Sequence, residues 1–104
     1  MKTAKLIVIY PTPSDLETFE QRYASEHVPM AVENLQGKTR FVASLINSEN
    51  AAYHRMAEVY FPNMHVLQEC LQSPGGQATA QHAVEISTGG QPIFLTAEVE
   101  SFEF

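Results

Sequence analysis

The strand-like segments of this chain are apolar on both faces. Side chains alternate between the two faces of a strand, so a sheet with one face in water alternates apolar with polar residues. Here neighbouring positions are both apolar, in the pairs Leu6/Ile7, Val8/Ile9, Phe41/Val42, Leu45/Ile46 and Val59/Tyr60. Helices of a small domain can cover only one face. We therefore expect a second copy to cover the other, in a homodimer packed through its sheet faces.

The order of the expected elements fits a known motif. Residues 5–10, 40–47, 53–61 and 94–102 are rich in β-branched and aromatic side chains and predict strands. Segments 15–27, 64–71 and, more weakly, 77–86 predict helices. The order is the split βαβ pattern of a ferredoxin-like βαββαβ sandwich, an α+β fold with a four-stranded antiparallel sheet. At 104 residues, residues 1–104 are expected to form a single domain.

Local signals set the ends of the first helix. Ser14 and Glu17 have the spacing of a capping box, which predicts Ser14 as the N-cap. Pro29 disfavours helical geometry in the residue before it. The helix should therefore lose regularity near His27, and a short second turn should follow over residues 29–33.

Polar residues, prolines and glycines separate the later elements. Ser48–Asn50 predicts the turn of a hairpin. Asn63 predicts a helix N-cap, and Ser73 predicts another, with Pro74 at the first helical position. Gly89-Gly90 is expected to close the last helix.

Composition argues against several classes of protein. The net charge is −6 and the six Lys and Arg residues are scattered, so neither nucleic acid nor an anionic membrane surface is an expected partner. The apolar run Leu6–Tyr10 is far shorter than the roughly 20 residues of a membrane span. Because no signal-peptide pattern is visible, the expected location is cytoplasmic. Cys70 is the only cysteine, which excludes an intrachain disulfide.

Phe19, Tyr23 and His27 are spaced four residues apart and form one stripe on the first helix. Such a stripe is either the core-facing side of an amphipathic helix or the wall of a small-molecule pocket. A helix C-terminus favours the cationic form of histidine and raises its pKa. We therefore predict His27 as a catalytic acid or base, with Tyr23 orienting the ligand.

Several motifs together resemble the EthD-like family of the dimeric α+β barrel superfamily. They are Tyr10-Pro11, Asp15, Phe19, Tyr23, His27-Val28-Pro29-Met30, Ser73-Pro74, Gly76-Gln77-Ala78 and Gly89-Gly90. The resemblance implies a ferredoxin-like fold that dimerises through its sheets, with a pocket between sheet and helices. It also implies a set of substrate-binding residues: Tyr10, Phe19, Met30 and His82.

The resemblance covers several chemistries. The family's namesake is linked to ether degradation alongside a cytochrome P450 system. Relatives in the wider superfamily include cofactor-free monooxygenases, polyketide cyclases, lactone isomerases and haem-handling enzymes. We expect an enzyme, an isomerase, cyclase or cofactor-free oxidoreductase, that acts on an apolar or aromatic small molecule by general acid/base chemistry. The alternatives are a non-catalytic binding or accessory protein for such a molecule in a degradation pathway, and a stripe that is only core.

One position departs from the family pattern. Where family members commonly have an acidic residue, this chain has His82. The expected pair is then His27 with His82, which has no fixed negative charge to hold an imidazolium. The four histidines also lack the short spacings typical of a metal site, so neither a metal nor another cofactor is expected.

Overall fold

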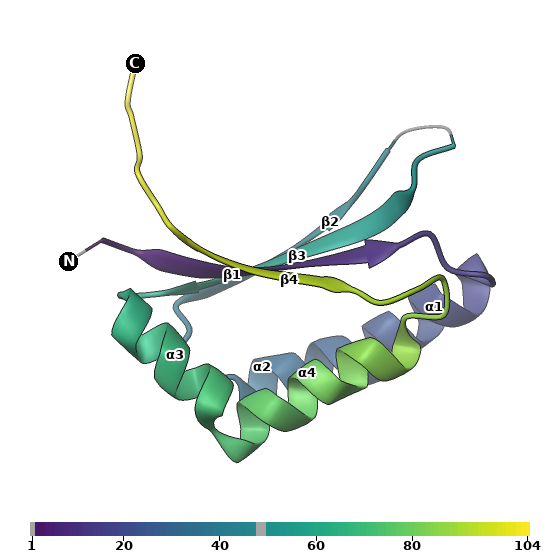
Figure 1. The fold of residues 1–104 in the computed structure, drawn as a ribbon, viewed down its shortest axis with the longest axis horizontal. Coiled ribbons are helices and arrows are strands. Elements are labelled where there is room, and N and C mark those ends of the chain that lie inside the picture. Colours follow the sequence, from purple (N-terminus) through teal and green to yellow (C-terminus); the bar gives the residue numbers. More distant parts are fainter. Residues whose placement is uncertain (1, 48–49) are drawn as a thin grey trace.

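The computed structural model describes residues 2–47 and 50–104. The elements are β1 (Ala4–Pro11), α1 (Leu16–Arg22), the π-helix η1 (Tyr23–His27), α2 (Val28–Asn34), β2 (Arg40–Leu45), β3 (Tyr53–Phe61), α3 (Met64–Gln72), α4 (Pro74–Ile86) and β4 (Ile93–Glu98). The strands pair antiparallel in the order β2-β3-β1-β4, with the helices together on one face (Figure 1). The predicted ferredoxin-like α+β fold is confirmed.

The sheet is apolar on both faces, as predicted. Residues of β1 that face the helices are buried: Ala4, Leu6, Val8 and Tyr10. The residues between them face the other side, where Ile7 is paired with Leu95 of β4 and Ile9 with Met56 of β3. The chain beyond β4 and the β2–β3 hairpin both turn toward this open face, away from the helices (Figure 1).

The first helix loses its α-helical regularity at Tyr23–His27 and a second helix, α2, follows with Pro29 in its first turn, as predicted. The backbone N–H of Val28 donates to the carbonyl of Tyr23, five residues back, which makes Tyr23–His27 a π-helix. In an α-helix the ring of Pro29 would clash with the carbonyl of Ser25. The wider π turn avoids this clash. Helix α2 then follows directly.

Three predicted boundaries were wrong. The N-cap of α1 is Asp15 rather than Ser14, because the Asp15 carboxylate accepts from both the amide and the hydroxyl of Thr18. The weaker helix expected from residue 77 is not separate, because α4 runs unbroken to Ile86 from Pro74, the predicted first helical position. Strand β4 ends at Glu98 rather than at residue 102, because its neighbour β1 begins at Ala4 and gives later residues no strand to pair with in the described chain.

The caps of the later helices are confirmed. The Asn63 side chain accepts from the amide of Val66 at 3.0 Å, and the Ser73 hydroxyl accepts from the amide of Gly76 at 3.0 Å. The hairpin between β2 and β3 is also confirmed by their antiparallel pairing. Of its predicted turn, Ser48 and Glu49 lie outside the described residues.

Candidate functional site

A small apolar cavity lies between the sheet and the helices, with an enclosed volume of about 40 Å³. Its polar lining residues are Tyr10, His27 and Thr79, and the others are mostly aliphatic or aromatic: Leu6, Val8, Ala31, Leu35, Phe41, Ala57, Val59, Leu71, Gly76, Ala80, Ala83 and Phe94. The volume suits a few water molecules. A larger molecule requires a lining side chain to move, and among the lining residues Phe94 is 40% exposed.

His27 lies at the end of the π-helix and is 5% exposed. Its Nε2 atom is 3.2 Å from the hydroxyl of Tyr10 on β1, and both side chains line the cavity. The imidazole stacks on Tyr23, with ring centroids 5.7 Å apart. One face of the ring is thus held by packing while one edge is held by a hydrogen bond.

The other nitrogen of His27 contacts His82 of α4, so the predicted pairing is confirmed. The two Nδ1 atoms are 2.9 Å apart. His82 Nε2 lies 3.3 Å from Oε1 of Glu26, and Glu26 in turn pairs with Arg22. In the family pattern the acidic residue stands at the position of His82. Here the negative charge is on Glu26, which contacts His82 rather than His27. Sequence reasoning missed it because Glu26 falls on the polar side of an ideal α-helix.

The buried groups of this site are neutral at pH 7. Burial, with His82 as a smaller cause, lowers the pKa of His27 to about 4. The predicted rise in the pKa of His27 was wrong, because burial disfavours the charged imidazolium. Burial also raises the pKa of the Tyr10 phenol above its usual range.

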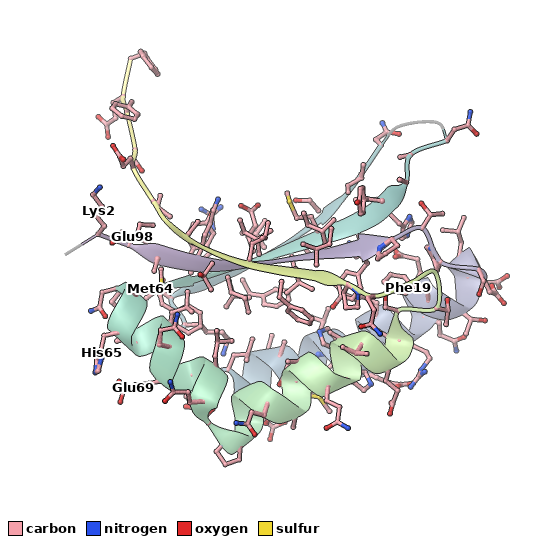
Figure 2. The ribbon with its side chains drawn as sticks, viewed as in Figure 1. Lys2, Phe19, Met64, His65, Glu69 and Glu98 are labelled. Atoms are coloured by element: carbon pink, nitrogen blue, oxygen red, sulfur yellow. The ribbon has the colours of Figure 1, made fainter. Side chains whose placement is uncertain are left out.

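The remaining stripe residues form a layer behind the cavity. Phe19, which points from α1 toward the sheet (Figure 2), stacks on Tyr23 and meets Tyr10 edge-on. The hydroxyl of Tyr23 is buried without a hydrogen-bond partner among the described residues, and burial raises its pKa to about 12. The predicted site residues that stand outside the cavity wall are Phe19, Tyr23, Met30 and His82.

An ion cluster that the sequence did not reveal closes the end of this layer. Glu20 of α1 accepts from Arg55 Nε at 2.9 Å and from His54 Nε2 at 3.0 Å. The Arg55 guanidinium lies over the ring of Tyr23, 4.8 Å from its centroid. Hydrogen bonding to Arg55 is the main cause that keeps the pKa of Glu20 below its usual range. These contacts hold α1 against β3 beside the site.

The described residues show neither a membrane-spanning helix nor a cluster of metal ligands. In the part of the chain that the structure describes, no helix combines the length and apolarity that crossing a bilayer needs. Residues 2–47 and 50–104 also contain no group of three or more His, Cys, Asp or Glu side chains placed to hold a metal ion.

Comparison with known proteins gives consistent matches. A family model described as the EthD domain matches residues 12–85. An uncharacterised 11.0 kDa protein from the thcB-thcC intergenic region of Rhodococcus erythropolis is 30% identical over 98 residues, which cover 90% of this chain and 93% of that protein.

Two solved structures share the fold. An ethyl tert-butyl ether D (EthD) family protein from Bacillus halodurans has a TM-score of 0.86 at 22% identity, over 94% of this chain and 99% of that one. Hydroxynitrile lyase from Passiflora edulis has a TM-score of 0.76 at 10% identity, over 98% of this chain and 97% of that one. At these identities the likeness concerns the fold alone.

Proposed function

The chain belongs to the EthD family, and on that premise we propose that it is a small-molecule enzyme that acts on an apolar or aromatic compound by general acid/base chemistry. The observation that carries the proposal is the contact between the Tyr10 hydroxyl and His27 Nε2 in the wall of an apolar cavity. A few convergent polar groups in an apolar pocket are typical of ligand sites.

The reaction that suits these groups is proton abstraction next to a carbonyl. Tyr10 presents a hydroxyl to the cavity, and His27 stands behind it as a neutral base. The acidic proton of the bound molecule passes to the Tyr10 oxygen while the Tyr10 proton moves to the imidazole. We assign Tyr23 the orientation of the imidazole on which it stacks, rather than direct contact with substrate.

Proton exchange on a simple ketone tests this reaction without knowledge of the natural substrate. Acetophenone is incubated with the protein in D₂O, and deuterium incorporation into its methyl group is followed by NMR. Exchange above the rate in buffer is expected, and it should fall by about 10²-fold or more in His27→Gln. His65→Gln is the matched control, because His65 lies on the outer side of α3, where its side chain is 75% exposed (Figure 2). Equal exchange in wild type and His27→Gln would exclude this role for His27.

A binding protein without chemistry is the second candidate, favoured by the predominantly apolar cavity wall. In that case acetophenone would shift the NMR signals of cavity residues such as Ala83 and Phe94, yet its methyl protons would exchange no faster than in buffer. Hydroxynitrile lyase from Passiflora edulis shares this fold, which supports the proposal of an enzyme.

We also propose a homodimer through the open sheet face. Leu95 on that face is 48% exposed, and its neighbours Ile7 and Ile9 are apolar. Of the charged residues there, Lys5 and Glu58 pair at 2.7 Å, and the Arg40 guanidinium lies over the ring of Tyr60. A second copy could therefore cover the centre of the face without leaving the Lys5–Glu58 charges unpaired.

A further inference from the structure

Four polar groups lie in a line that runs from the cavity to the surface. The line begins at the Tyr10 hydroxyl and ends at the Glu26 carboxylate, whose side chain is 46% exposed. The intervening steps are 3.2 Å to His27 Nε2, 2.9 Å between the two Nδ1 atoms, and 3.3 Å from His82 Nε2 to Glu26. Every step is within or close to hydrogen-bond distance.

The carboxylate at the outer end fixes the direction of each hydrogen bond. An ionised Glu26 only accepts, so His82 must carry its proton on Nε2. With this single proton on its ring, His82 accepts at Nδ1, which requires a proton on Nδ1 of His27. His27 Nε2 is left as an acceptor, and the Tyr10 hydroxyl donates to it. All the donors thus point outward, from the cavity toward Glu26.

Burial makes a stepwise transfer unfavourable at this site. A tyrosinate at Tyr10 or an imidazolium at His27 would be a charge in an apolar environment, and the pKa of each group is displaced against that charge. If all the protons move together, each buried group is neutral before and after the transfer. Only the two ends of the line change charge.

We propose that the paired histidines His27 and His82 form a proton relay that joins the Tyr10 hydroxyl in the cavity wall to the Glu26 carboxylate at the surface. A proton leaves the bound molecule for the Tyr10 oxygen as the Tyr10 proton moves to His27 Nε2. The Nδ1 proton of His27 passes to His82 Nδ1, and the Nε2 proton of His82 passes to Glu26. The bound molecule becomes an anion and Glu26 becomes neutral. This use of the relay rests on the proposed acid/base function.

The groups around the outer end favour release of the proton to water. Arg22 pairs with both Glu26 and Glu85, and its hydrogen bonds are the main cause that holds the pKa of Glu26 below its usual range. A protonated Glu26 therefore gives up its proton readily. Tyr23, which stacks on the inner histidine, is the other titratable side chain that packs against the pair.

Histidine ring tautomers measured by ¹⁵N NMR at pH 7 test the relay in the absence of any ligand. His27 is expected to carry its proton on Nδ1 and His82 on Nε2. In Glu26→Gln the amide can accept or donate, so the single tautomer of each ring should give way to a mixture. Glu85→Gln is the matched control, because Glu85 contacts Arg22 but lies outside the line, and the tautomers should stay as in wild type.

The outcomes separate the relay from the proposed function. The opposite tautomers in wild type, or an unchanged pattern in Glu26→Gln, would overturn the relay whether or not acetophenone exchanges. If exchange is observed, Glu26→Gln should slow it by at least about tenfold while Glu85→Gln leaves it unchanged. If the rings show the expected tautomers but acetophenone does not exchange, the line of hydrogen bonds stands. That result would overturn the acid/base function and, with it, the proposed role of the relay in catalysis.

Discussion

The imidazole rings of His27 and His82 lie parallel, with an interplanar angle of 7°, centroids 5.2 Å apart and Nδ1 atoms 2.9 Å apart. Only one of the facing nitrogens can carry a proton, because two N–H groups would point at each other. The pair therefore disfavours a doubly protonated state, in addition to the cost of burying charge. This arrangement and its surroundings determine how the protein responds to acid and to substitution.

Stability should fall as the pH is lowered from 6.5 toward 4. The pKa of His27 is about 4 in the folded protein and about 6.5 when unfolded. Between these values the unfolded state binds a proton that the folded state does not, so acid favours unfolding, by up to about 3 kcal/mol. Urea unfolding at pH 7.5, 6.5, 5.5 and 4.5 measures the trend. His27→Gln should show a flatter profile over this window, and an equal slope in both proteins would contradict the assignment.

Tyr10→Phe should destabilise the protein modestly while leaving its fold intact. The substitution removes one hydroxyl and leaves Nε2 of His27 buried without its partner, at a cost of about 1–2 kcal/mol. The comparison is Tyr53→Phe at the exposed start of β3, which should change the free energy of unfolding by less than about 0.5 kcal/mol. Similar values for the two variants would show that the Tyr10–His27 contact adds no stability.

Glu20→Gln should weaken the attachment of α1 to β3. The substitution leaves the Arg55 guanidinium, whose side chain is only 15% exposed, without its carboxylate. We expect a loss of about 1–2 kcal/mol, less than for a fully buried pair because 38% of the Glu20 side chain is exposed. Thermal unfolding beside Glu85→Gln, an exposed ion-pair partner on α4, provides the comparison. The idea fails if both variants melt at the same temperature.

Ile7→Lys should convert the proposed dimer to a monomer. It places a charge at the centre of the open face, beside Leu95, where a partner sheet would have to bury it. Sedimentation at micromolar concentration reports the mass of both proteins. Val84→Lys on α4, at a site 39% exposed, should leave the mass unchanged. A wild-type protein that sediments as a monomer would rule out the dimer itself.

Much of the fold was predictable because its signals are local. β-Branched and aromatic residues marked the strands, and Asn63 and Ser73 acted as the caps that their side chains suggested. The continuity of α4 from Pro74 into residues 77–86 was missed because Gly75 and Gly76 are poor helix formers. Glycine is needed there, since a Cβ on Gly76 would collide with the Cys70 carbonyl where α3 meets α4.

The site was predictable only in part, for a geometric reason. The resemblance to the EthD family, now shown, brought out Tyr10, His27 and His82, which the fold brings into contact. It could not show Glu26 joining them, because its position beside His82 depends on the packing of η1 against α4. The Glu20 cluster likewise depends on contacts more than 30 residues apart in sequence.

The π-helix also governs which changes in length the first helix can accept. A π turn holds one residue more than an α turn, so losing one residue between Arg22 and His27 would convert the π turn to an α turn. The ring of Pro29 would then meet the carbonyl four residues before it. The number of residues between Tyr23 and Pro29 is therefore constrained. Insertions or deletions should be tolerated in the β2–β3 turn but not between Tyr23 and Pro29.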